Sequence, residues 1–211
     1  MRLICRLIMP LNRALPTIYF VRHGETDWNR QSLIQGSIET DLNAHGQQQA
    51  QDVAQALLYK REELIGFQFV CSPQRRAQQT MGYITSALGI SMEQVKTEPR
   101  VRELGFGVWE GKPIWELKAS PIYPADAEGK YYWRPEGGEN YADGMARVDD
   151  WLATVTQPTL VVAHGAVGRC LMGFVAGLKP EDTVRLKTPQ GCYCRLQNGQ
   201  IDWFDASHNQ V

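Results

Sequence analysis

Three short apolar runs, each followed by polar residues and then by a helical pattern, constrain the fold of this 211-residue chain most strongly. They lie at 17–21, 67–71 and 159–163 and are rich in β-branched and aromatic side chains. Strands that alternate with helices are typical of βαβ units. A hairpin within 192–204, with its turn at 198–199, is expected at one edge of the sheet. The sequence therefore predicts an α/β fold, a three-layer α/β/α sandwich with a mostly parallel central sheet.

Local signals place the helices that follow these strands. Asn43 is a candidate N-cap for a helix that continues to about Tyr59. Ser72 followed by Pro73 predicts another helix start, with the serine as N-cap and the proline at the first helical position. A third helical pattern follows the last of the three strands and ends near Leu178.

The chain carries no repeat and no Ser/Gly-rich linker, so we expect a single domain at 17–205. The segments 1–16 and 206–211 are expected to be poorly ordered tails. Residues 112–142 differ from the rest, because they hold six of the 20 aromatic residues and show little periodicity. Segments of this kind often cover a pocket or form subunit contacts, so 112–142 is a candidate lid and a homodimer stays open.

The composition excludes several classes of partner. A formal net charge of −1 argues against nucleic acid or an anionic membrane surface as a partner. The longest apolar stretch, 159–178, is interrupted by His164 and Arg169, so no membrane-spanning helix is expected. Five widely spaced cysteines, in a chain long enough to form its own core, are typical of reduced thiols in a cytoplasmic protein.

Polar residues with phosphate-binding chemistry follow all three strands. In open parallel sheets, ligands bind beyond the carboxyl ends of the strands, so we expect these residues to converge. Guanidinium groups bind a phosphate dianion with two charge-assisted hydrogen bonds, and a neutral imidazole can attack phosphorus without losing a proton first. A second, protonated imidazole would add positive charge in the transition state. The residues concerned are Arg22, His23, Gly24, Ser72, Arg75, Arg76, His164 and Gly165.

Several longer motifs surround these residues and follow one another in a fixed order. They are VRHGETDWN (21–29), QG (35–36), SPQRRAQQT (72–80), RELGFGVWEG (102–111), GGE (137–139) and AHG (163–165). Together they resemble the signature of the histidine phosphatase superfamily, which includes the cofactor-dependent phosphoglycerate mutases. The resemblance covers about residues 17–178. It implies a phosphoglycerate mutase-like fold, with a mostly parallel sheet between helices, and chemistry that uses no metal ion and no bound cofactor.

The same resemblance implies a role for each matching residue. His23 is the nucleophile that becomes phosphorylated, and His164 is the second histidine of the phosphate pocket. Glu103 is the proton donor to the leaving group. The catalytic set is completed by the two arginines that hold the phosphoryl oxygens, Arg22 and Arg76. The residues implied in substrate binding are Arg22, Asn29, Gln35, Arg76 and Gly165.

Two positions near the second strand need a decision from the sequence. The family pattern has the second arginine four residues after Ser72, which selects Arg76 and leaves Arg75 at a variable position. Successive helix positions are ~100° apart, so both arginines cannot point into one pocket. Gln74 stands where the family usually has an apolar residue.

The predicted function is hydrolysis of a small phosphorylated metabolite, a phosphomonoester, through a phosphohistidine intermediate. The stretch 104–107 differs from the Arg-His-Tyr-Gly-like stretch of the mutases, and FGVWEG at 106–111 is similar to the phosphatase branch. A phosphoglycerate mutase is the alternative, and a non-catalytic scaffold is a third hypothesis. Glu103 must carry its proton when the substrate arrives, which predicts a mildly acidic rate optimum.

Overall fold

A six-stranded sheet forms the centre of the computed structural model, which describes residues 15–207. Most of the predicted tails at 1–16 and 206–211 therefore lies outside the described residues. The order of the strands across the sheet is β3-β2-β4-β1-β5-β6. The strands are β1 (Ile18–Arg22), β2 (Gln68–Cys71), β3 (Lys96–Thr97), β4 (Thr159–Ala163), β5 (Tyr193–Gln197) and β6 (Gln200–Phe204).

The sheet is mixed and mostly parallel, as the sequence predicts. β4 lies between β1 and β2 and pairs with both in parallel, while β3 pairs in parallel with β2. The antiparallel pairs are β1 with β5 and β5 with β6, and the last two strands form the predicted hairpin. Because β1, β4 and β2 are parallel neighbours, their carboxyl ends meet at one edge of the sheet.

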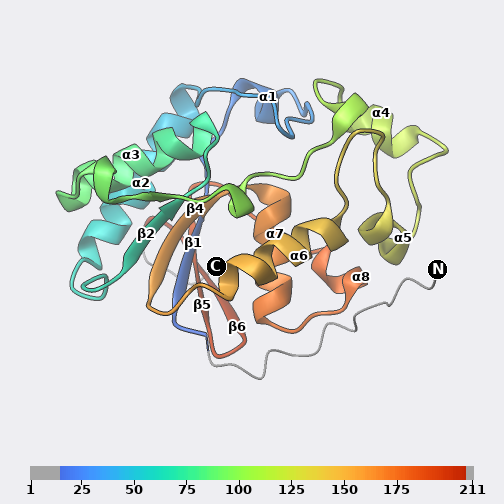
Figure 1. Cartoon of the computed structure of the whole chain (residues 1–211). Helices are drawn as coiled ribbons and strands as arrows, with labels where there is room; N and C mark the ends of the chain where they lie inside the picture. The colour runs from blue at the N-terminus through green and yellow to red at the C-terminus, as the bar shows by residue number, and fades with distance from the viewer. Residues whose placement is uncertain (1–14, 208–211) are drawn as a thin grey trace.

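Helices cover both faces of the sheet, with α2 and α3 on one side and α6 and α7 on the other (Figure 1). None of the helices within residues 15–207 is long and apolar enough to cross a bilayer. The α-helices are α1 (Asp27–Arg30), α2 (Ala44–Tyr59), α3 (Arg75–Leu88), α4 (Ile114–Ala119), α5 (Ala127–Tyr132), α6 (Tyr141–Leu152), α7 (Gly165–Val175) and α8 (Pro180–Thr183). Short 3₁₀-helices occur at Met92–Gln94, Pro99–Val101 and Gly107–Trp109.

The strands are apolar at successive positions because both faces of the sheet are buried. Side chains of β1 alternate between two core clusters, in keeping with the two-residue period of a strand. Ile18 and Phe20 pack with residues of α6 and α7. Tyr19 and Val21 pack with residues of α2 and α3. The three-layer sandwich therefore has one hydrophobic core on each side of the sheet.

The two predicted helix starts have different outcomes. Asn43 caps α2 as predicted, since its side chain accepts a hydrogen bond from the backbone N–H of Gly46. The prediction that Ser72 caps α3 is wrong, because this helix begins at Arg75 and Gln74 occupies the N-cap position without a side-chain cap. The Ser72 hydroxyl instead lies 2.6 Å from an imidazole nitrogen of His164, so contact with a distant strand end replaces the local cap.

The aromatic segment 112–142 contains the two short helices α4 and α5. Tyr131 of α5 is buried, and its ring packs against the rings of Tyr132 and Tyr141. Tyr123 and Trp133 form an edge-to-face pair with ring centroids 5.1 Å apart. Many of these aromatic rings thus pack against one another, which fixes the segment beside α6.

Two glycines in helices give a stability prediction. A Cβ at Gly168 in α7 would overlap the ring of Phe20, whereas a Cβ at Gly82 in α3 would meet nothing within 4 Å. We expect Gly168→Ala to lower the free energy of unfolding by about 1–3 kcal/mol through overpacking. Gly82→Ala, the matched control, should raise it by about 0.5–1 kcal/mol, because alanine favours a helix interior. Urea denaturation measures both, and a Gly168→Ala protein as stable as the wild type would contradict this packing.

Candidate functional site

The two histidines that follow β1 and β4 lie side by side. His23 is 2% exposed and His164 is fully buried, and their ring centroids are 5.1 Å apart. Ser72, which follows β2, contacts His164, so three neighbouring strand ends contribute to one place. The predicted convergence of the strand ends is therefore present in the structure.

A backbone carbonyl determines which nitrogen of His23 carries the proton. Nδ1 lies 2.7 Å from the carbonyl oxygen of Gly24, which can only accept a hydrogen bond. Nδ1 must therefore be the donor, and in the neutral ring the lone pair lies on Nε2. Gly24 is itself fixed, because its N–H donates to Thr80 and its Cα lies against the backbone of Gly46. In this tautomer the Gly24 contact leaves the lone pair of Nε2 unused.

His164 is held through its other nitrogen. Its Nε2 lies 2.6 Å from Ser72 Oγ, and this oxygen accepts a hydrogen bond from the backbone N–H of Gln74. When the Ser72 O–H donates to Nε2, the proton of the neutral ring lies on Nδ1. Nδ1 is buried and has no hydrogen-bond partner among the described residues. This nitrogen is therefore available to a ligand.

Backbone carbonyl oxygens hold the side chains of Arg22 and Arg76 at the site through hydrogen bonds. Arg22 donates through Nη1 to Thr188 O at 2.8 Å. Arg76 donates through Nη1 to Ile38 O and through Nη2 to Gly36 O, at 2.8 and 2.9 Å. The Nε–H of each arginine is buried and has no hydrogen-bond partner within residues 15–207. Such unpartnered donors on two cations are what a bound anion would satisfy.

The neighbouring arginine, Arg75, lies elsewhere. Its side chain is exposed and forms an ion pair with Asp41, with 3.3 Å between the charged atoms. Arg76 is fully buried, and its charge acts on both histidines. The structure therefore brings Arg76 and not Arg75 to the site.

Burial keeps both imidazole rings neutral. Desolvation holds the pKa of His23 well below its usual range, and the charges of Arg76 and Arg22 lower it further. Desolvation also lowers the pKa of His164, again with help from Arg76. The second imidazole is thus uncharged in the protein alone, in contrast to the protonated form considered from the sequence, and it offers hydrogen bonding in place of charge. Burial lowers the pKa of Arg22 to about 10, so this side chain stays charged at neutral pH.

Glu103 reaches the same place from the segment that precedes α4. Its carboxylate accepts hydrogen bonds from the backbone N–H groups of Ala166 and Val167, at 3.0–3.1 Å, in the first turn of α7. The positive end of the helix dipole favours a carboxylate at this position. Gly165 separates it from Arg22, since a Cβ there would lie 3.6 Å from both Arg22 Cζ and Glu103 Oε2.

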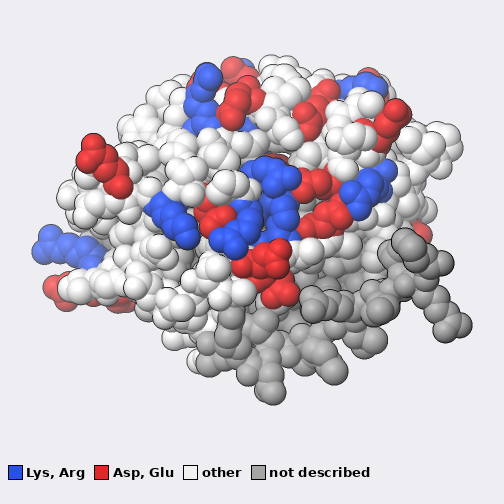
Figure 2. Space-filling view, viewed as in Figure 1, with Lys and Arg blue, Asp and Glu red and all other residues white. Residues whose placement is uncertain are grey.

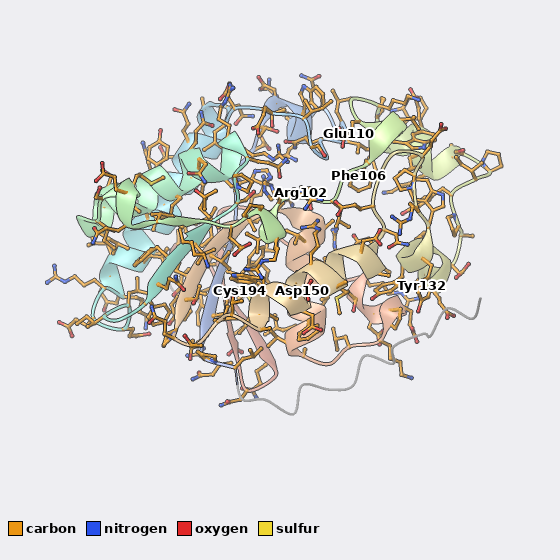
Figure 3. The ribbon with its side chains drawn as sticks, in the orientation of Figure 1. Arg102, Phe106, Glu110, Tyr132, Asp150 and Cys194 are labelled. Carbon is orange, nitrogen blue, oxygen red and sulfur yellow. The ribbon has the colours of Figure 1, made fainter. Side chains whose placement is uncertain are left out.

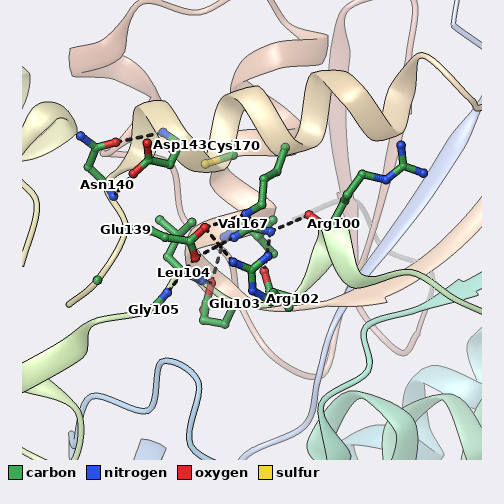
Figure 4. A network of polar contacts seen from close by, with 12 residues as sticks. Arg100, Arg102, Glu103, Leu104, Gly105, Glu139, Asn140, Asp143, Val167 and Cys170 are labelled. Carbon is green, nitrogen blue, oxygen red and sulfur yellow. Dashed lines mark hydrogen bonds and ion pairs between the residues drawn. The ribbon is translucent and has the colours of Figure 1, made fainter.

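A second acid stabilises the segment that carries Glu103. Glu139 accepts hydrogen bonds from Arg102 and Arg147 and from the backbone N–H of Gly105, at 2.9–3.2 Å (Figure 4). Arg147 also donates to the carbonyl oxygens of Arg100 and Arg102. This network attaches the chain on both sides of Glu103 to helix α6.

Asn29 and Gln35, predicted to bind substrate, lie at different distances from this centre. Gln190 donates through Nε2 both to His23 O and to Asn29 Oδ1, at 3.0 and 3.1 Å, so Gln190 connects Asn29 to the loop that carries His23. Gln35 is buried and accepts a hydrogen bond from Thr40. It precedes Gly36, whose carbonyl binds Arg76, but no hydrogen bond among the described residues joins its side chain to the histidines.

Sequence reasoning missed the chain between α8 and β5. Two alternate residues of this stretch contact the site: Thr188 O accepts from Arg22, and Gln190 donates to His23. The two-residue spacing is that of extended chain, but no apolar pattern marks it as such. The one signal in the sequence is position, because a chain that leads into the edge hairpin must pass the carboxyl ends of the parallel strands.

Positive and negative side chains are interspersed on the surface of the protein. Lys and Arg side chains alternate with Asp and Glu on the face shown in Figure 2. Within residues 15–207, no three His, Cys, Asp or Glu side chains gather as a metal site. The arrangement suits a small anion held by a few placed donors.

Curated proteins of similar sequence carry phosphatase and mutase names. The "Probable phosphoglycerate mutase GpmB" of Yersinia enterocolitica is 32% identical over 194 residues, which cover 89% of this chain and 87% of that protein. The "Uncharacterized phosphatase PhoE" of Bacillus subtilis is 28% identical, with 92% of this chain and 95% of that protein covered.

Solved structures share the fold. A mycobacterial glucosyl-3-phosphoglycerate phosphatase in complex with VO3 has a TM-score of 0.70 and 26% identity, covering 89% of this chain and 96% of that chain. The alpha-ribazole phosphatase of Shigella flexneri has a TM-score of 0.70 and 28% identity, covering 85% of this chain and 89% of that chain. The family model for the histidine phosphatase superfamily (branch 1) matches residues 18–209, almost the whole described structure, and the chain therefore belongs to this superfamily.

Proposed function

We propose that this protein hydrolyses a small phosphorylated metabolite, a phosphomonoester, through a phosphohistidine intermediate. The observation that carries the proposal is the pair of neutral, buried imidazoles beside Arg22 and Arg76. His23 has its Nε2 lone pair free, and His164 has an unpartnered Nδ1. An uncharged nucleophile among fixed donors is what attack on a phosphate dianion requires.

In the first step, Nε2 of His23 attacks phosphorus and the bond to the leaving oxygen breaks. Arg22 and Arg76 bind the phosphoryl oxygens, and His164 donates a hydrogen bond through Nδ1–H. Glu103 gives its proton to the leaving oxygen, which departs as an alcohol. The His23 ring becomes cationic on phosphorylation, and its Nδ1–H bond to the Gly24 carbonyl grows stronger.

In the second step, a water molecule attacks the phosphoryl group from the side that the alcohol left. Glu103, now a carboxylate, accepts a proton from this water. The bond between phosphorus and Nε2 of His23 breaks, its electron pair returns to the nitrogen, and inorganic phosphate leaves. Because Glu103 regains its proton from this water, the site is back in its starting state when phosphate leaves.

The names of the similar solved structures support hydrolysis. Two structures of the same fold are named a glucosyl-3-phosphoglycerate phosphatase and an alpha-ribazole phosphatase. Several curated relatives are instead named probable phosphoglycerate mutases, so a phosphoglycerate mutase is the alternative outcome of the experiment below. A non-catalytic scaffold is the third.

The first prediction concerns the nucleophile. The wild type should hydrolyse 4-nitrophenyl phosphate, with inhibition by vanadate and no loss in the presence of a chelator. His23→Ala should lower kcat/KM by at least about 10³-fold, because it removes the nitrogen that accepts the phosphoryl group in the proposed mechanism. His45→Ala is the matched control, since this histidine of α2 is exposed and its ring hydrogen-bonds Gln49.

The substrates used separate the three hypotheses. Turnover of the aryl phosphate without any added compound supports the hydrolase. Turnover that appears only with added bisphosphoglycerate would indicate a mutase, and complete inactivity of the wild type would favour the scaffold.

The second prediction compares the two neighbouring arginines. Arg76→Ala should lower kcat/KM by about 10²–10³-fold, as for removal of a donor to a developing oxyanion. Arg75→Ala removes the same charge one residue away and only breaks an exposed ion pair with Asp41, so we expect a change of less than about twofold. Equal losses in the two variants would show that overall charge, not the position of Arg76, matters.

The third prediction concerns pH. Because the pKa of His23 lies well below its usual range, the nucleophile stays unprotonated in mild acid. The first turn of α7 favours the carboxylate form of Glu103, whereas the first step needs its acid form, so kcat/KM for an alkyl phosphomonoester should be higher in mild acid than in alkaline solution. Glu103→Gln should lower the rate by about 10²–10⁴-fold and remove this pH dependence. A wild-type optimum in alkaline solution, with full activity, would contradict the proposed acid.

A further inference from the structure

Gln74 is a buried polar residue that joins the two segments on either side of the reacting groups. Its side chain donates through Nε2 to the carbonyl oxygen of Gly36 at 2.8 Å. Its Oε1 accepts a hydrogen bond from the backbone N–H of Glu103 at 2.7 Å. The residue is only 6% exposed, and both ends of its amide group are in use. An amide group that makes one hydrogen bond to each of two loops fixes the distance between these loops.

We propose that Gln74 is a positioning residue, which sets the location of the Glu103 carboxyl group relative to the leaving oxygen. This inference rests on the proposed function, in which Glu103 supplies the proton. The carboxylate of Glu103 is anchored to the first turn of α7, and its backbone N–H is anchored to Gln74. The residue is therefore held at both ends, and loss of the Gln74 contact releases one of them.

The chemistry of the contact requires an amide. The carbonyl oxygen of Gly36 also accepts from Arg76, but a side chain that joins this carbonyl to the N–H of Glu103 must offer both a donor and an acceptor. An apolar residue at position 74, as the resemblance to the family leads one to expect, would leave both backbone groups without these partners. The amide of Gln74 therefore connects the Gly36 loop to Glu103.

The phosphate-binding arginine does not depend on this contact. Arg76 donates to Gly36 O and to Ile38 O by its own two Nη atoms. Glu110 also joins the same two segments, because its Oε1 accepts from the N–H groups of Ser37 and Phe106. Phe106 and Glu110 lie on the chain that leads from Arg102 toward α4 (Figure 3). Removing the Gln74 amide should therefore affect proton donation more than phosphoryl binding.

The test compares two substrates with the same enzyme preparation. 4-Nitrophenolate leaves readily without a proton, whereas an alkoxide needs one, so the ratio of kcat/KM for an alkyl phosphomonoester to that for the aryl phosphate reports proton donation. Misfolded protein lowers both values equally and cancels in the ratio. We expect Gln74→Leu and Gln74→Met each to lower the ratio about tenfold, as a small displacement of a reacting group would.

Gln79→Leu is the matched control. Gln79 lies in the same helix and also uses both ends of its amide, on Asp41 and on the N–H of Leu42, but it does not contact Glu103. Its substitution should leave the ratio unchanged. In a Glu103→Gln background, Gln74→Leu should cause no further fall in the ratio, because there is then no acid to position.

The outcomes separate this inference from the proposed function. If Glu103→Gln lowers the ratio but neither Gln74 variant does, the positioning role is wrong and the hydrolase mechanism stands. If Gln79→Leu lowers the ratio as much as Gln74→Leu, the effect is general to α3 and the inference is also wrong. If Glu103→Gln leaves the ratio unchanged, Glu103 is not the acid, and both proposals fall.

Discussion

The site depends on keeping two imidazole rings buried and neutral beside two guanidinium groups. Four positive charges in this volume would repel one another, and desolvation prevents that by lowering the pKa of His23 and His164. The remaining cations, Arg22 and Arg76, are compensated mainly by backbone carbonyls and by the charge of Glu103. Carbonyl oxygens are suitable partners because they stabilise a cation without neutralising it, so its charge remains available to an anion.

Most of these stabilising contacts are made by the main chain, so the fold itself fixes the positions of the side chains in the site. Gly24 O determines the tautomer of His23, and the N–H groups of the first turn of α7 hold Glu103. These groups are fixed by the parallel pairing of β1 with β4 and by the helix that follows β4. The side chains then need only to be the right residues at the strand ends, because the backbone supplies the geometry.

The same distinction explains what the sequence could predict. The strands, the Asn43 cap and the converging histidines follow from local patterns, and all of them are present. The prediction that Ser72 caps α3 is wrong because its hydroxyl contacts His164, 92 positions away, and local capping rules do not consider such contacts. Gln190 reaches His23 across 167 positions, and no pattern near either residue indicates it. Contacts between polar side chains on separate loops depend on the finished packing, so they become visible only in the structure.

The segment 112–142 bears on the choice between hydrolysis and shuttling. A shuttle must exclude water while the histidine is phosphorylated, which is usually achieved by closure over a bound ligand. Here α5 is fixed by protein packing, since Tyr131 is 2% exposed and contacts Tyr132 and Tyr141. A segment whose position is set by its own aromatic contacts does not need a ligand to order it. The order of this segment therefore does not depend on closure over a ligand, which agrees with the proposed hydrolysis more than with a shuttle.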